Sequence, residues 1–129
     1  MKENNLIQEK SYQFALEIIA LYKHLTTERK EFVLSKQLLK SGTSIGANIE
    51  EAVGGQSQKD FFAKISIAYK EARETHYWIR LLKDSQFLPI DRASQLLEMC
   101  DELLRILGSI QITMQKKLDK NPASSIENS

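Results

Sequence analysis

Hydrophobic residues recur along this chain every three or four positions and divide it into four segments. Because successive residues of an α-helix are turned by about 100°, this spacing gathers the apolar side chains on one face. The pattern predicts helices over residues 6–25, 28–53, 57–83 and 91–118, and no segment alternates as a strand does. The expected core positions are Ile7, Phe14, Ile18, Leu21, Tyr22, Leu25, Leu34, Leu38, Ile45, Ile49, Ala52, Phe61, Ile65, Ala68, Ala72, His76, Ile79, Leu96, Cys100, Leu103, Leu107, Ile110 and Met114.

Turn-forming residues separate the four segments. Residues 26–28, Thr-Thr-Glu, offer a hydroxyl cap and an acidic first turn for the second helix. Gly54-Gly55 ends that helix, and residues 57–60, Ser-Gln-Lys-Asp, resemble a capping box that opens the third. Pro89 and Asp91 break the chain and restart it as the fourth helix.

Short connections between long helices favour antiparallel neighbours. The sequence therefore predicts an all-α, up-down-up-down antiparallel four-helix bundle, with helices about 30 to 42 Å long. The bundle is expected to span residues 6–118 as one domain. Residues 1–5 are expected to be a disordered N-terminus, and residues 119–129, which are polar and contain Pro122, a disordered tail.

The second helix carries small and polar residues beside its core face. Gly42 and Gly46 line one shoulder, and each costs a helix about 1 kcal/mol relative to alanine, which close approach of another helix would offset. The other shoulder, here called the polar seam, consists of Ser41, Ser44, Asn48 and Glu51. Its structural interpretation is a hydrogen-bonded seam that fixes the register between helices or subunits. The functional alternative is a polar cluster facing a ligand.

Apolar residues also occur away from the expected core faces of two helices. They are Tyr12, Leu16 and Ile19 in the first helix and Ile67, Trp78 and Leu81 in the third. An exposed patch of this kind usually marks an interface, which predicts a homo-oligomer. The alternative is a wide core face with scattered surface apolar residues, which are common.

Length, charge and cysteine content narrow the class of protein. A chain of 129 residues suffices for one domain with a substantial core. The formal net charge of +1 excludes a uniformly basic nucleic-acid binder, so any electrostatic partner must meet a local patch. Cys100 is the single cysteine, which excludes an internal disulfide and suits a reducing compartment. With no signal peptide and no membrane span recognisable, we expect a cytoplasmic protein without a membrane partner.

Motifs that support catalysis or cofactor binding are missing from the sequence. Bundles can hold a di-iron site through Glu-x-x-His pairs, but Leu21 and Arg73 stand three residues before His24 and His76. Cys100 lies on an apolar face and is expected to be an inert buried thiol. No phosphate-binding glycine loop, nucleophile motif or zinc spacing occurs. We therefore expect no enzyme activity, no metal, no cofactor and no small-molecule substrate.

One face of the third helix combines cations with an aromatic ring. This basic stripe consists of Lys59, Lys70, Arg73, Tyr77 and Arg80. Basic side chains interleaved with aromatic ones suit phosphate binding combined with base stacking. The alternative is an ordinary solvated face whose cations pair with the nearby Glu71 and Glu74. In a ring of subunits the stripe would be repeated, which could strengthen weak binding.

Several stretches of the chain resemble the bacterial four helix bundle protein family, first noticed within intervening sequences of large-subunit ribosomal RNA genes. They are residues 34–41, residues 44–52 (Ser-Ile-Gly-Ala-Asn-Ile-Glu-Glu-Ala), Ser57-x-x-Asp60-Phe and residues 70–82. The resemblance implies an up-down bundle that assembles as a pentamer. A related branch, the accessory variability proteins of diversity-generating retroelements, binds nucleic acid and a reverse transcriptase. The matching motif residues are Ser41, Ser44, Asn48, Glu51, Tyr77 and Leu81, and the family implies no catalytic role for them.

Three hypotheses about function follow. The first is a non-enzymatic, oligomeric helical bundle that binds RNA or DNA, or a nucleic-acid-processing partner, through repeated basic surfaces. The second is a structural or protein-interaction module that makes no nucleic-acid contact. The third is a small-ligand binder that uses Asn48 and Glu51 of the polar seam.

Overall fold

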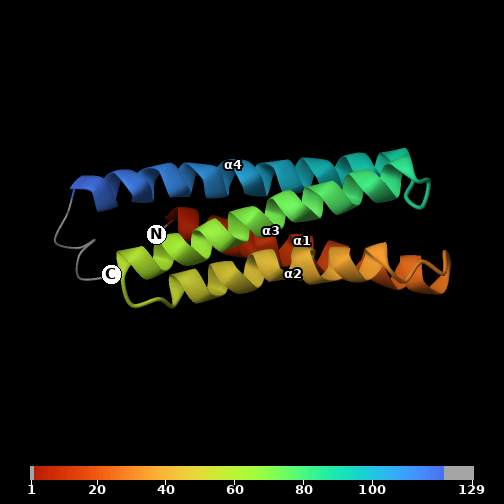
Figure 1. The fold of residues 1–129 in the computed structure, drawn as a ribbon, viewed down its shortest axis with the longest axis horizontal. Coiled ribbons are helices and arrows are strands. Elements are labelled where there is room, and N and C mark those ends of the chain that lie inside the picture. Colours follow the sequence, from red (N-terminus) through yellow and green to blue (C-terminus); the bar gives the residue numbers. More distant parts are fainter. Residues whose placement is uncertain (1, 121–129) are drawn as a thin grey trace.

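Four antiparallel helices make up the part of the chain that the computed structural model describes, residues 2–120. They are α1 (Lys2–Thr27), α2 (Leu34–Val53), α3 (Gln58–Asp84) and α4 (Ile90–Lys120), and no strand occurs in this range. α1 and α3 each pack against both α2 and α4. Figure 1 shows the helices side by side, with consecutive helices running in opposite directions. The predicted all-α four-helix bundle is confirmed.

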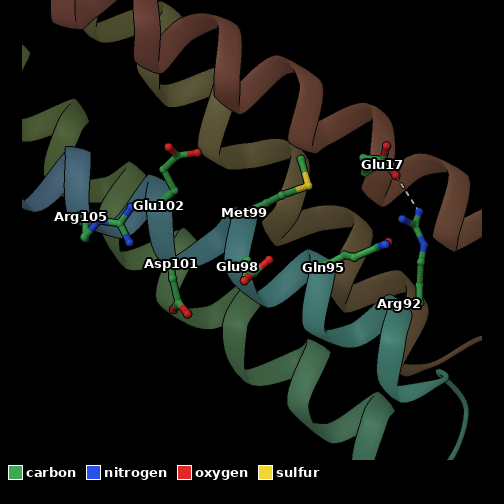
Figure 2. Close-up of a pocket in the computed structure, with 8 residues that line it drawn as sticks. All are labelled: Glu17, Arg92, Gln95, Glu98, Met99, Asp101, Glu102 and Arg105. Carbon is green, nitrogen blue, oxygen red and sulfur yellow. Dashed lines mark hydrogen bonds and ion pairs between the residues drawn. The ribbon is translucent and has the colours of Figure 1, made fainter.

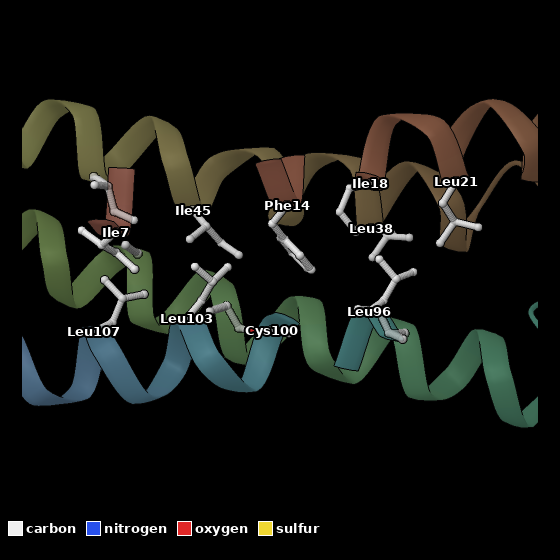
Figure 3. Close-up of a cluster of buried hydrophobic side chains, with 14 of the residues drawn as sticks. Ile7, Phe14, Ile18, Leu21, Leu38, Ile45, Leu96, Cys100, Leu103 and Leu107 are labelled. Atoms are coloured by element: carbon white, nitrogen blue, oxygen red, sulfur yellow. Dashed lines mark hydrogen bonds between the residues drawn. The ribbon is translucent and has the colours of Figure 1, made fainter. Parts of the chain in front are cut away.

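A single core runs along the bundle and takes side chains from all four helices (Figure 3). Phe14 and Leu38 are fully buried, and complete burial of such a side chain contributes about 1.5 to 3 kcal/mol to stability. The predicted core positions are buried with four exceptions that are half-buried: Tyr22, Leu34, Phe61 and His76. Helical periodicity was therefore sufficient to find most of the core.

His76 was wrongly assigned to the core. The fully buried residue at this level of α3 is Thr75, whose hydroxyl oxygen lies 2.9 Å from that of Ser41 on α2 in a hydrogen bond between the helices. His76 lies one residue further round α3, toward α4, where its Nε2 approaches Asp101. At that edge the polar ring lies against a carboxylate.

The second helix begins at Leu34, six residues later than predicted. The Thr26 and Thr27 hydroxyls do not cap α2, because they donate to the Tyr22 and Lys23 carbonyl oxygens within α1. Instead the Glu31 carboxylate reaches forward to the start of α2 and accepts hydrogen bonds at 2.7 to 3.1 Å from the backbone N–H groups of residues 33–35. A carboxylate at this end also complements the helix dipole.

The environment of Glu31 favours its charged form. Burial raises the pKa of this carboxyl, but the backbone hydrogen bonds from residues 33–35 outweigh burial and lower the pKa below its ordinary value overall. A group whose pKa is depressed by folding stabilises the folded state above its unfolded pKa. That stabilisation is lost as the pH falls through the lowered value, so the cap of α2 weakens only in acid.

The remaining helix boundaries differ less from those predicted. The capping interaction before α3 is confirmed, since the Ser57 hydroxyl accepts from the Asp60 backbone N–H at 3.0 Å. α1 begins at Lys2, so residues 2–5, expected to be disordered, belong to the helix. α4 continues to Lys120, and the rest of the expected disordered tail, residues 121–129, lies outside the described residues.

The glycines of α2 face α1, as their predicted role requires. A Cβ atom on Gly42 would lie 2.9 Å from both Cγ1 and Cγ2 of Ile18, closer than real Cβ contacts come. A Cβ atom on Gly46 would lie 3.4 Å from the Ser11 hydroxyl oxygen, a distance close to ordinary contact. The prediction of close helix approach is confirmed at Gly42, where the missing side chain lets α1 and α2 meet.

Candidate nucleic-acid interface

The basic stripe lies along the outer face of α3 and turns toward α4. Its five residues fall within about one quarter of the helix circumference and extend over about 30 Å of its length. Lys70, Arg73, Tyr77 and Arg80 are exposed and Lys59 is half-buried. The predicted grouping of these residues on one face therefore holds in the folded chain.

No carboxylate neutralises the cations of the stripe at close range. Among the described residues, neither Lys59, Lys70, Arg73 nor Arg80 has a carboxylate oxygen within 4.0 Å. The ion pairs found in residues 2–120 are Lys10–Glu102, Lys64–Glu51, His76–Asp101, Lys83–Asp84 and Arg92–Glu17. In the described residues the cations of the stripe are therefore solvated and form no ion pair with Glu71 or Glu74.

Neither of the two glutamates expected to pair with the stripe forms an ion pair with it among the described residues. Glu74 accepts a hydrogen bond of 3.3 Å from the Trp78 indole N–H. The pKa of Glu71 is raised, first by burial and then by repulsion from Glu74, although Lys70 and Lys40 act to lower it. Lys70 therefore interacts electrostatically with Glu71 but does not form an ion pair with it within 4.0 Å.

Arg80 is held in place by a chain of polar contacts that crosses to α4. Its Nε–H donates to His76 Nδ1 at 3.1 Å, and His76 Nε2 lies 3.1 Å from Asp101 Oδ1. Because Nδ1 accepts, the ring in this arrangement is the neutral imidazole, with its proton on Nε2 directed at the carboxylate. The guanidinium carbon of Arg80 also lies 5.8 Å from the centroid of the Tyr77 ring, within cation–π range.

Tyr77 presents an exposed aromatic surface next to these cations. The side chain is 47% exposed, and its ring meets that of Trp78 edge to face at a centroid separation of 5.2 Å. Such an edge contact orients the Tyr77 ring while much of it stays open to solvent. A base could therefore stack on it beside a guanidinium group.

A cleft of about 490 Å³ opens where the stripe meets α4. It is lined by Arg73, Glu74, His76, Tyr77, Arg80, Asp101 and Leu104. His76 and Asp101 were not among the predicted binding residues. The four-residue spacing of His76 and Arg80 could have indicated their contact, whereas Asp101 joins them only through the packing of α3 on α4.

The polar seam of α2 is satisfied within the chain. Ser41 bonds to Thr75, and the Asn48 side-chain amide donates to the Ser44 carbonyl and hydroxyl oxygens at 2.9 and 3.0 Å. Glu51 pairs with Lys64 of α3 at 3.2 Å. Every buried side-chain nitrogen or oxygen of the described residues has a hydrogen-bond partner. These contacts fit the structural interpretation of the seam, in which it joins α2 to α3.

The residues predicted for an oligomer interface divide into two groups. Tyr12 is 63% exposed, Leu16 46% and Ile67 40%. Ile19, Trp78 and Leu81 are half-buried, and Trp78 packs against the core. Three of the six predicted residues, Tyr12, Leu16 and Ile67, are thus exposed, and the described chain also exposes apolar side chains elsewhere, among them Phe32, Val33, Ile90 and Ile112.

The pocket between α1 and α4 has the wrong charge for a nucleic acid. It has a volume of about 600 Å³ and holds four carboxylates, on Glu17, Glu98, Asp101 and Glu102, against two arginines (Figure 2). Arg92 forms an ion pair with Glu17, with 2.7 Å between Arg92 Nη2 and Glu17 Oε2. The stripe on α3, whose cations have no carboxylate in contact, is therefore a better candidate for binding a nucleic acid than this pocket.

The Cys100 thiol is buried and hydrogen-bonded within the core. Burial raises the pKa of the Cys100 thiol to about 12, with a smaller contribution from Asp101, and the thiol donates to the Ala72 carbonyl oxygen at 3.2 Å. No group of three or more His, Cys, Asp or Glu side chains in this range could hold a metal ion. None of the helices in the described range is both long and apolar enough to cross a membrane.

Fold and surface together define the class as an all-α up-and-down helical bundle with a basic helix face. The chain belongs to the 23S rRNA-intervening sequence protein family, whose model matches residues 3–109, and the predicted family resemblance is confirmed. It is 46% identical to a protein of unknown function from the S23 ribosomal protein family of Bacteroides thetaiotaomicron VPI-5482. That likeness covers 84% of this chain and 97% of that one, with a TM-score of 0.83. No curated protein matches the chain.

Proposed function

We propose that this chain is a non-enzymatic helical bundle that binds RNA or DNA through the basic stripe of α3. The observation that carries the proposal is that four cations line one face of α3 with no carboxylate in contact among the described residues. Cations that are already paired inside a protein gain little from a phosphate. The stripe instead offers its charge to an outside anion.

The arrangement of Arg80 and Tyr77 supports a nucleic acid over other anions. The guanidinium is fixed beside an exposed ring by its bond to His76 and by its position 5.8 Å from the ring centroid. Phosphate binding by the cations would supply affinity, and stacking on Tyr77 would favour a strand with unpaired bases.

Salt dependence tests the proposal. We expect a fluorescent single-stranded RNA or DNA of about 15 nucleotides to bind, with log K falling linearly against log salt at a slope of about −3 for four phosphate contacts. Raising the salt from about 50 to 200 mM should then weaken binding by roughly 50-fold. Fluorescence anisotropy measures this directly. Absence of binding at low salt, or affinity that does not respond to salt, would contradict the proposal.

The second candidate function is self-association into a protein-interaction module, and the exposed apolar residues of α1 favour it. Tyr12 and Leu16 stand exposed on a helix whose other face already fills the core. Surfaces of this kind usually contact another protein. Assembly of several copies would cover these two residues and would repeat the stripe of α3 around the particle. The pentamer implied by the family resemblance is one such assembly.

Leu16→Glu tests self-association without disturbing the core, because this side chain is 46% exposed. We expect light scattering of the wild-type chain to give a multiple of 14.8 kDa, and the variant to shift toward that single-chain mass. Lys116→Glu, at an exposed site on α4, serves as the control for added negative charge. A wild-type mass of one chain at high concentration would rule the interface out. Trp78→Ala is a poorer test, since Trp78 packs against the core.

A further inference from the structure

His76 is the histidine of the cleft between α3 and α4. Imidazole is the side chain that ordinarily titrates between about pH 5 and 8. Its ring is half-buried, with Nδ1 accepting from Arg80 and Nε2 against Asp101. A proton on His76 therefore acts on the same arginine that the proposed nucleic-acid interface uses.

The charge of the cleft depends on this ring. Arg73 and Arg80 contribute two positive charges, and Glu74 and Asp101 two negative charges, so the cleft is neutral while His76 is neutral. One proton on His76 makes the cleft net positive. The carboxylate in contact with His76 is that of Asp101. The positive charge gained by the ring would therefore lie beside a negative charge at the surface of the bundle.

Protonation also changes the hydrogen bonds of Arg80. A protonated imidazole carries hydrogen on both nitrogens, so Nδ1 could no longer accept from Arg80 Nε. The Nε2–H bond to Asp101 would persist and keep the ring in place. The Nε–H of Arg80 would then be free to donate to a phosphate, and Nδ1–H of His76 would become a further donor toward the same anion.

We propose that His76 controls the affinity of this cleft for nucleic acid, because binding takes up a proton at His76 and so strengthens as the pH falls. The inference rests on the proposed function and names its regulation. The ligand is the phosphate backbone of a nucleic acid, which the added positive charge and the freed Nε–H of Arg80 both favour. By linkage, a proton taken up on binding makes affinity rise on acidification.

The charged groups that face His76 come from α3 and α4. On α3 it is flanked by Arg73, Glu74, Tyr77 and Arg80, and α4 faces it with Asp101. On the α2 side of α3, the charged residues Lys40 and Glu51 act on Glu71 and Lys64 instead. The chain has two histidines, and the other, His24, is exposed in the last turn of α1. His24 therefore provides a matched control.

The experiment measures the affinity of a labelled single-stranded RNA at constant ionic strength from pH 8.0 to pH 5.5. We expect the wild-type chain to bind about fivefold more tightly at the lower pH, as one charge-assisted contact is gained. His76→Gln, which keeps a donor and an acceptor but takes up no proton, should lose this gain. His24→Gln should retain it. Circular dichroism confirms that each variant is folded before it is compared.

A second variant tests whether the net charge of the cleft, without protonation of the His76 ring, is enough to raise the affinity. Asp101→Asn makes the cleft net positive without a proton, so its affinity at pH 8.0 should rise by about the same factor. A full pH gain in His76→Gln, or weaker wild-type binding in acid, would overturn the inference and leave the proposed function standing. Lower or unchanged affinity of Asp101→Asn at pH 8.0 would also overturn it. Failure of every oligonucleotide to bind at any pH would instead defeat the proposed function.

Discussion

The triple variant Lys70→Glu, Arg73→Glu, Arg80→Glu is expected to bind single-stranded nucleic acid more than about 100-fold more weakly than the wild-type chain at low salt. The change removes three phosphate contacts and replaces them with repelling charges. All three side chains are exposed, so the bundle should remain folded. Each substitution should change the free energy of unfolding by about 0.5 kcal/mol or less. Anisotropy measures the affinity, and thermal melting followed by circular dichroism measures the fold.

A matched variant distinguishes the effect of the stripe on binding from the effect of the net charge of the chain. Lys23→Glu, Lys36→Glu, Lys116→Glu changes three exposed lysines away from the outer face of α3. Each triple variant exchanges three positive for three negative charges, so both carry a net charge of −5 (+1 − 6). The control should lose far less affinity. Equal losses would show that binding follows net charge and would remove the reason for assigning it to α3.

Gly42→Ala and Gly46→Ala, one turn apart in the same helix, are expected to change stability in opposite directions. A Cβ on Gly42 would lie 2.9 Å from two atoms of the fully buried, β-branched Ile18, which has little freedom to move aside. We expect Gly42→Ala to cost about 1 to 3 kcal/mol of unfolding free energy. At Gly46 the added methyl meets ordinary contact, so the gain in helix propensity, up to about 1 kcal/mol, should dominate.

Urea unfolding midpoints measure both glycine variants under the same conditions. A further arm places Gly42→Ala in an Ile18→Ala background, which removes both contacting carbons. There the alanine at position 42 should be harmless or stabilising, and the coupling between the two sites should exceed about 0.5 kcal/mol. Equal effects of the two glycine variants, or no coupling to Ile18, would contradict the close approach of α1 and α2 at this point.

Periodicity predicted the helices and most of the core because burial on one helix face follows directly from the spacing of apolar residues. It failed at Glu31, where the cap of α2 comes from a carboxylate that reaches forward to the N–H groups of residues 33–35. The threonines before it matched the usual capping pattern and were misleading. It also failed at His76, because spacing alone does not distinguish a core position from one at the edge of the neighbouring helix.

The candidate interface was predicted only in part. The common face of the five stripe residues follows from helix geometry alone. Whether their charges are paired depends on side-chain conformation, and the sequence left Glu71 and Glu74 as equally suitable partners. The bond from Arg80 to His76 joins residues four apart, but Asp101 belongs to another helix and required the packing of α3 on α4.

Native mass spectrometry of the wild-type chain with a single-stranded RNA of about 15 nucleotides, at low and then high ammonium acetate, tests the proposed function most directly. We expect a protein–RNA complex at low salt whose share declines steadily as salt increases, because phosphate contacts release counterions. The same spectra count the copies of the 14.8 kDa chain in the particle. Protein peaks without RNA at every salt concentration would contradict nucleic-acid binding and leave self-association as the function to pursue.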